Sequence, residues 1–259
     1  MNVAGIDCGA KTIKVLILSD GGIAAKSSVS SGFDQKAAAE NAYHMALEKA
    51  GLQKEDVSHI TATGAGKEEA TFAPSTVTEV GADAKAVHHL YPSARTVIDV
   101  GAEGGRAIRI NQEGKFVDFA INDKCAAGAG TFIETMALAL EINMEEMGSL
   151  SLSSDREVSM KAQCAVFAES EVVSLIHANY SKADIARAVH DAIADRIASM
   201  ARKVGIEKDV VLVGGMSRNI GFVKSLERIL KEDVLIPDDP EFSCAHGAAL
   251  VAAERAERG

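Results

Sequence analysis

Two of the four cysteines in the chain stand directly before segments that have the pattern of helix starts. Cys125 lies in INDKCAAGAGTFIE, residues 121–134, and Cys164 lies in AQCAVFAESEV, residues 162–172. A thiolate at a helix N-terminus lies near unpaired amides and the positive end of the helix dipole, which favours an anion there. The two positions therefore suit metal-binding thiolates. Two buried structural cysteines would give the same pattern, so both interpretations stay open at this point.

A metal cluster bound by this pair would need ligands from a second chain. An iron–sulfur cluster with four thiolate ligands needs four cysteines, and Cys125 and Cys164 supply two. A two-fold dimer would bring the same pair from each subunit. The other cysteines, Cys8 and Cys244, are expected to be packing residues. Four cysteines in 259 residues do not make a disulfide framework.

Two strand–turn–strand patterns carry a second kind of chemistry. NVAGIDCGAKTIKVLIL, residues 2–18, and TVIDVGAEGGRAIRI, residues 96–110, both place an aspartate after an apolar strand and before glycine. Such an aspartate can hold hydrated magnesium through an oxygen, and glycine lets backbone amides approach a polyphosphate. A single copy could be a hairpin with an acidic corner. The second copy favours a duplicated nucleotide site.

A third segment, VVLVGGMSRN at 210–219, is a buried strand that ends in two glycines, where a nucleoside could lie against bare backbone. In this order the three segments resemble the phosphate-1, phosphate-2 and adenosine motifs of the actin, sugar-kinase and heat-shock-chaperone ATPase superfamily. TATGAGKEE, residues 61–69, is not a P-loop, because Thr61 stands where that motif needs glycine and Glu68 follows the lysine.

The elements that would position these motifs follow from the hydrophobic periodicity. Strands are expected at 2–7, 13–19, 22–30, 57–64, within 96–110, and at 115–121, 209–215 and 233–236. Helices are expected at 34–50, 81–91, 130–142, 164–178, 183–204 and 219–231, and from 243 onwards. The superfamily resemblance implies an α/β fold with two actin-like (ribonuclease-H-like) domains around an ATP cleft. Their expected bounds are 1–92 and 93–259, with the last helix packing back on the first domain.

Composition narrows the class of protein. Hydrophobic residues make up 47% and charged residues 25% of the chain, which is ordinary for a globular protein. The formal net charge of −10 argues against a nucleic-acid partner. There is no signal-peptide pattern and no long uninterrupted apolar run, so we expect a cytoplasmic protein without a membrane partner.

The segments NDKCAAGAGTFIE and CAVFAESEVVS, together with the ATPase motifs, resemble the activators of 2-hydroxyacyl-CoA dehydratases and the ATPase subunits of benzoyl-CoA reductase. The resemblance implies ATP, Mg²⁺ and one 4Fe–4S cluster per dimer, with Cys125 and Cys164 as its ligands. It implies ATP-driven transfer of a low-potential electron. The implied partners are a second copy or a paralogue, a CoA-ester dehydratase or reductase component, and a reductant such as ferredoxin or flavodoxin.

The second phosphate turn departs from the pattern of this family. The activators commonly read IDIGGQD, whereas this chain reads VIDVGAEGG, so Glu103 stands in place of glutamine and Gly104 in place of an acidic residue. This version looks more like a benzoyl-CoA reductase ATPase subunit, so pairing with a paralogue stays open. Glu103 is the candidate for positioning the attacking water, and Asp99 for holding magnesium through water.

The remaining residues expected at the nucleotide come from the same motifs. They are Asp7, Gly9, Lys11, Thr12, Lys14, Gly101, Gly128, Gly130, Glu134, Gly214, Gly215 and Asn219. Only Ala126, Ala127, Gly128 and Ala129 separate Cys125 from Gly130. Movement of the phosphate amides should therefore also move the cysteine, and a side chain at Gly128 should uncouple the two. Glu169 or Glu171 could link the cluster loop to the nucleotide or could lie on a solvated helix face.

Two other classes of function remain as alternatives. A small-molecule kinase of the same fold would bind no metal cluster and would release a phosphorylated product. However, the sequence shows no sugar-binding loop with an aspartate base. A regulatory module that binds nucleotide without electron transfer would also lack iron. The colour of the anaerobically purified protein separates both alternatives from the iron–sulfur protein.

Overall fold

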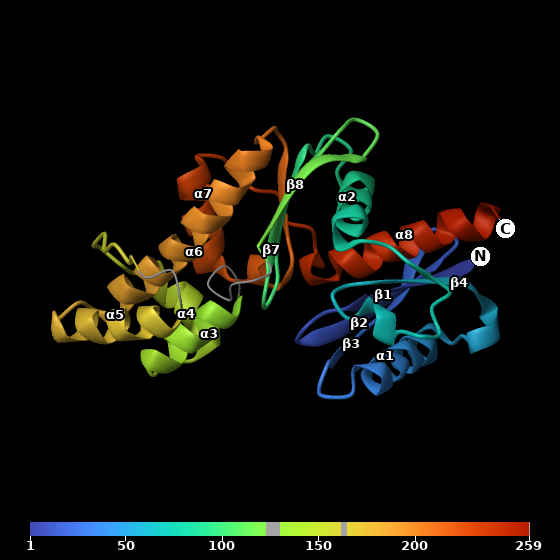
Figure 1. Cartoon of the computed structure of the whole chain (residues 1–259), viewed down its shortest axis with the longest axis horizontal. Coiled ribbons are helices and arrows are strands. Elements are labelled where there is room, and N and C mark those ends of the chain that lie inside the picture. Colours follow the sequence, from blue (N-terminus) through green and yellow to red (C-terminus); the bar gives the residue numbers. More distant parts are fainter. Residues whose placement is uncertain (123–129, 162–164, 259) are drawn as a thin grey trace. The chain divides into compact units, whose positions relative to one another are not determined.

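The computed structural model describes residues 1–122, 130–161 and 165–258 (Figure 1). The chain forms two compact units. Unit 1 comprises Met1–Ser93, Ile110–Phe116 and Glu241–Gly259, and unit 2 comprises Ala94–Arg109 and Val117–Pro240. The C-terminal segment therefore belongs with the N-terminal unit. Among the described residues, no helix is long and apolar enough to cross a membrane.

Unit 1 is built on a mixed sheet with the strand order β3-β2-β1-β4-β5. Its strands are β1 (Asn2–Cys8), β2 (Thr12–Ser19), β3 (Gly22–Ser30), β4 (Val57–Thr63) and β5 (Ser75–Thr76). β1 to β3 form antiparallel hairpins, and β4 runs parallel to β1. Two short 3-10 turns, η1 (Lys54–Asp56) and η2 (Lys67–Glu69), flank β4. The carboxyl ends of β1 and β4 therefore meet at one edge of the sheet.

Helices cover both faces of this sheet (Figure 1). α1 (Gln35–Ala50) packs on the face that carries Ala4 and Ile6. α8 (Ser243–Arg258) packs on the face that carries Val3 and Leu16, and α2 (Glu79–Leu90) lies against α8. Side chains alternate between the faces of a strand. Asp7 therefore cannot share the α1 face, where its neighbours Ile6 and Cys8 are buried.

α8 approaches its neighbours at backbone distance. A β-carbon on Gly5 of β1 would lie 2.0 Å from the Ala245 carbonyl oxygen. A β-carbon on Gly247 of α8 would lie 1.8 Å from the Ala82 carbonyl oxygen of α2. Glycine is the residue that permits such close approach of backbone to backbone. These two glycines allow α8 to pack closely on β1 and α2.

Unit 2 has the strand order β8-β7-β6-β9, with β6 parallel to β9. The strands are β6 (Thr96–Val100), β7 (Gly105–Ile110), β8 (Phe116–Asn122) and β9 (Val210–Val213). The helices are α3 (Gly130–Ala139), α4 (Met144–Ser151), α5 (Ala165–His177), α6 (Lys182–Val204) and α7 (Ile220–Leu230), with the 3-10 turn η4 (Gly215–Arg218). The 3-10 turn η5 (Pro240–Phe242) begins at the last residue of unit 2 and leads into α8. Buried residues of β6, α3 and α6, such as Ile98, Phe132 and Ile193, share one core.

The structure corrects three expectations about these elements. α4 was not predicted, because its sequence MEEMGSLS contains glycine and serines, and its burial against α6 and α7 outweighs that propensity. The expected strand at 233–236 is wrong, since only Leu235 forms a bridge there, with Val211. α3 stops at Ala139 rather than 142, and Glu141 adopts a left-handed φ of 52°.

Candidate functional site

Residues 9–11 join β1 to β2 and form the first of the two turns predicted to bind phosphate, here called the first phosphate turn. Asp7, near the end of β1, is 7% exposed and is the register partner of Lys14 on β2. The Lys14 Nζ lies 3.4 Å from Asp7 Oδ2. The hairpin thus brings together a nearly buried carboxylate and a cation at the edge of the sheet. This pairing keeps an oxygen ligand in place where the strand ends.

The turn itself is held by Ser31. The Ser31 hydroxyl donates to the Gly9 carbonyl at 2.7 Å, and the Ser31 amide donates to the Lys11 carbonyl at 2.9 Å. A β-carbon on Gly9 would lie 2.8 Å from the Thr12 carbonyl oxygen. Lys11 is exposed and Thr12 is half-buried. Hydrogen bonds therefore hold this turn in one conformation at the carboxyl end of β1, where Lys11 is exposed to solvent.

The segment that follows β4, residues 64–66, lies beside this turn. Gly64 has a φ of 94°, and a β-carbon there would lie 2.8 Å from Asp7 Oδ1. The Gly66 amide donates to the Cys8 carbonyl at 3.0 Å. A cavity of about 690 Å³ opens beside Gly66. Its lining residues are Ala10, Phe33, Asp34, Gln35, Ala65, Gly66 and Glu69. The position of this segment beside Asp7 was not predicted. The available signal was a Gly-Ala-Gly run directly after a buried strand.

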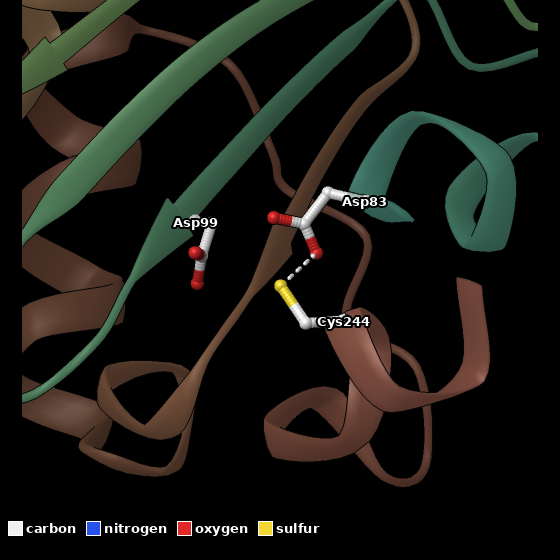
Figure 2. A group of neighbouring side chains, drawn as sticks. All are labelled: Asp83, Asp99 and Cys244. Carbon is white, nitrogen blue, oxygen red and sulfur yellow. Dashed lines mark hydrogen bonds between the residues drawn. The ribbon is translucent and has the colours of Figure 1, made fainter. Parts of the chain in front are cut away.

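Cys8 and Cys244 are both buried in unit 1, and neither forms a disulfide within the part of the chain that the structure describes. Burial, with smaller contributions from the negative charges of Asp7 and Glu69, raises the pKa of Cys8 to about 12. A thiol held protonated in this way is a poor metal ligand. The Cys244 Sγ donates to Asp83 Oδ1 at 3.3 Å, which ties the start of α8 to α2 (Figure 2). Their predicted role as packing residues agrees with this burial.

The second phosphate turn repeats the pairing of the first. Asp99 lies on β6 (Figure 2) and is 6% exposed. Its register partner is Arg106 on β7. The Arg106 guanidinium forms an ion pair with the Asp99 carboxylate. In both hairpins a cation stands seven residues after the aspartate, as 14 − 7 and 106 − 99 show. Arg106 is a candidate site residue that was not predicted, although this spacing in the sequence could have revealed it.

Hydrogen bonds tie the second turn to the start of α3. The Gly101 amide donates to the Gly104 carbonyl at 2.9 Å and closes the turn. The Gly130 amide then donates to the Gly101 carbonyl, and the Thr131 amide to the Ala102 carbonyl, both at 2.9 Å. The Thr131 hydroxyl also donates to the Ala102 carbonyl, at 2.5 Å. The helix that follows the Cys125 segment is thus anchored on a phosphate turn.

The third segment leaves β9 at Gly214, which has a φ of 86°. A β-carbon there would lie 2.3 Å from Asp99 Oδ1 and 2.5 Å from the Val100 carbonyl oxygen. A β-carbon on Gly215 would meet no atom within 4 Å. Bare backbone therefore lies against the second aspartate, with open space beside it.

The positions of the other predicted site residues do not show whether they contact a nucleotide. Glu103 is exposed on the second turn, and Glu134 is half-buried on α3. The Asn219 side chain accepts a hydrogen bond from the Phe222 amide at 3.1 Å, so it caps α7. The Glu171 carboxylate accepts from the Lys161 amide at 2.9 Å, whereas Glu169 is exposed. None of these contacts assigns a role at a nucleotide.

Cys125, Gly128 and Cys164 lie outside the described residues. The helices that follow their segments are described: α3 begins at Gly130 and α5 begins at Ala165, the residue after Cys164. α3 and α5 pack against each other in unit 2.

Residues 4–252 match the BadF/BadG/BcrA/BcrD ATPase family. This chain belongs to that family. It is 38% identical to the activator of lactoyl-CoA dehydratase of Anaerotignum propionicum, with both chains covered completely. It is 34% identical to one of the subunits of benzoyl-CoA reductase from Thauera aromatica, over 98% of this chain and 94% of that one.

A solved structure with a very similar fold is also found. The (R)-2-hydroxyglutaryl-CoA dehydratase component A of Acidaminococcus fermentans superposes with a TM-score of 0.95 at 35% identity, over 99% of both chains. The predicted fold class, α/β with actin-like domains, is confirmed. The predicted resemblance to activators and reductase ATPase subunits is confirmed as family membership.

Each unit, taken by itself, carries groups of the kind that magnesium and phosphate bind. Asp7 and Asp99 offer carboxylate oxygens, which magnesium prefers. Gly9 and Gly214 form cradles that a β-carbon would fill. The buried Thr63 hydroxyl, beside the first turn, has no hydrogen-bond partner within the described ranges. The residues predicted to bind an iron–sulfur cluster lie outside those ranges, so their fit rests on the sequence.

Proposed function

We propose that this family member is an ATP-dependent donor of low-potential electrons that serves a CoA-ester dehydratase or a benzoyl-CoA-type reductase. The relatives named as a lactoyl-CoA dehydratase activator and a benzoyl-CoA reductase subunit match 100% and 98% of this chain. The observation that carries the proposal is the set of hydrogen bonds from Gly130 and Thr131 to the second phosphate turn. Through these bonds, a shift of the turn on nucleotide binding would also shift the start of α3, the helix that follows Cys125.

At the nucleotide, Asp7 and Asp99 would hold magnesium through water, and the turn amides with Lys11, Thr12 and Lys14 would bind phosphate. Glu103 would orient the attacking water, and Gly214 and Gly215 would leave room for the nucleoside. Magnesium, when bound, neutralises phosphate charge. The protein's own part is to fix these groups at the ends of β1, β6 and β9.

At the electron-transfer site, Cys125 and Cys164 of two subunits would bind one 4Fe–4S cluster, which supplies one-electron chemistry when present. The second subunit is a copy or a paralogue of this chain. A ferredoxin or flavodoxin would supply the electron, and the dehydratase or reductase component would accept it. Family membership favours this function over the small-molecule kinase.

Loss of either aspartate should abolish ATP hydrolysis and leave the cluster in place. In Asp7→Ala and Asp99→Ala we expect the ATPase rate to fall at least about 100-fold, because the magnesium–phosphate group loses an oxygen partner. Iron content should stay at the wild-type level, since the cluster ligands are separate. Phosphate release and iron analysis on the same preparations measure both. Wild-type hydrolysis in either variant would contradict the assignment of these turns.

Coupling between nucleotide and cluster is tested by Thr131→Val. This variant loses the hydroxyl bond to the Ala102 carbonyl and keeps the shape of the side chain. We expect the difference between the cluster's electron paramagnetic resonance spectra with ADP and with ATP to fall by at least about half, since the anchor weakens. The matched control is Thr135→Val, whose hydroxyl donates to the Thr131 carbonyl within α3 and so lies outside the anchor to the second turn.

A wild-type spectrum that is the same with ADP, with ATP and without nucleotide would refute the coupled function, even if iron and ATPase activity were both present. Equal loss in Thr131→Val and Thr135→Val would show instead that α3 was merely destabilised.

A further inference from the structure

Thr63 ends β4 and is completely buried, yet its Oγ1 has no hydrogen-bond partner among the residues that the structure describes. An unpaired buried hydroxyl destabilises the folded protein, because on folding it loses its hydrogen bonds to water and forms none in their place. Thr61 shows the usual outcome. It lies two residues earlier on the same face, is equally buried, and its Oγ1 is 2.9 Å from the Ser75 hydroxyl. The unpaired hydroxyl of Thr63 therefore needs an explanation.

The place of Thr63 supplies one. In the parallel pairing of β1 and β4, Thr63 is the partner of Asp7, so both side chains leave the same face of the sheet. The next residue, Gly64, lies directly against Asp7, where a β-carbon would be 2.8 Å from its Oδ1. The side chains of Thr63 and Asp7 are therefore neighbours on this face of the sheet, at the turn predicted to bind phosphate.

We propose that Thr63 is a binding residue whose hydroxyl bonds an oxygen of the magnesium–phosphate group at Asp7. The proposal rests on the proposed function, since it assumes that the first turn binds a magnesium nucleotide. A hydroxyl can donate to a phosphate oxygen and can also bond a water ligand of magnesium. It stays unpaired in the free protein because its partner arrives with the ligand. The segment 63–66, although it is not a P-loop, then completes the first phosphate turn.

The test compares Thr63→Val with Thr63→Ser and with the matched control Thr61→Val. Valine keeps the shape of threonine and removes the hydroxyl, whereas serine keeps the hydroxyl. Thermal unfolding without nucleotide and the affinity for a non-hydrolysable ATP analogue are measured for each variant. Affinity is measured once with Mg²⁺ and once with EDTA.

For Thr63→Val we expect a Tm without nucleotide that is unchanged or about 2 °C higher, since an unpaired hydroxyl is removed. Its Kd for the magnesium–analogue complex should rise about tenfold, the effect of one lost hydrogen bond. Thr63→Ser should bind within about threefold of the wild type. Thr61→Val should unfold at lower temperature, because it loses an existing bond, and should bind the analogue normally.

The two affinity measurements identify the oxygen. A loss confined to the Mg²⁺ arm assigns the bond to a water ligand of magnesium, and a loss in both arms assigns it to phosphate. Wild-type affinity in Thr63→Val overturns the proposal, and so does a lowered Tm or a failure to fold, which would mean that the hydroxyl has a structural partner. If the wild-type protein itself binds no magnesium nucleotide, the proposed function fails instead.

Discussion

Cys125→Ser and Cys164→Ser are each expected to yield protein without iron. Two thiolates per chain fit one bridging cubane, so anaerobically purified wild-type protein should contain about four irons per dimer. A serine hydroxyl is a poor substitute for a thiolate in such a cluster. The loss of either cysteine removes two of the four ligands when the second subunit is a copy of this chain, and one when it is a paralogue. Iron analysis and the visible absorption spectrum measure the result.

The controls for this experiment are the other two cysteines. Cys8→Ser and Cys244→Ser should keep their iron, because both thiols are buried in unit 1 and the Cys8 thiol is held protonated, with a pKa of about 12. Serine at position 244 can still donate to Asp83 and so preserves the contact between α8 and α2. Iron that persists in Cys125→Ser or Cys164→Ser would exclude that residue as a ligand.

Gly247→Ala is expected to destabilise unit 1 by about 3 kcal/mol, a typical upper cost for an extra methyl group in a closely packed core. The added β-carbon would lie 1.8 Å from the Ala82 carbonyl oxygen and 2.7 Å from the Ala82 Cα. Both are backbone atoms, so no side chain can rotate away. The helices α8 and α2 must separate, which disrupts the packing of α8 on the sheet.

Urea unfolding followed by circular dichroism measures this loss. Gly5→Ala should be of similar severity, because its β-carbon would meet the backbone of α8 at Ala245. Gly22→Ala is the control, since its nearest neighbour would be the Ser19 carbonyl oxygen at an ordinary 3.7 Å. If the midpoint of Gly247→Ala equals that of Gly22→Ala, α8 does not pack on unit 1 as described.

The sequence was sufficient for features that local pattern controls. The β1–β2 and β6–β7 hairpins, with Asp7 and Asp99 near the strand ends, were predicted because alternating apolar residues and glycine turns act over a few positions. The family was also readable, since the cysteine segments and glycine turns are contiguous motifs. Register within a hairpin follows from its turn, so even the Asp99–Arg106 pair was within reach.

The tertiary structure alone decided the contacts between distant segments. Thr63 became a neighbour of Asp7 through parallel pairing across 56 positions (63 − 7), and Gly130 became attached to the turn at Gly101. α4 formed against its intrinsic propensity because its burial against α6 and α7 stabilises it, and residues 233–236 failed to form a strand because only Leu235 bridges to Val211. The free energy of such contacts comes from residues that no local window contains. The turn after β1 and the segment after β4 are therefore visible in the sequence as separate turns, and they become neighbours only when the sheet of unit 1 pairs the two strands.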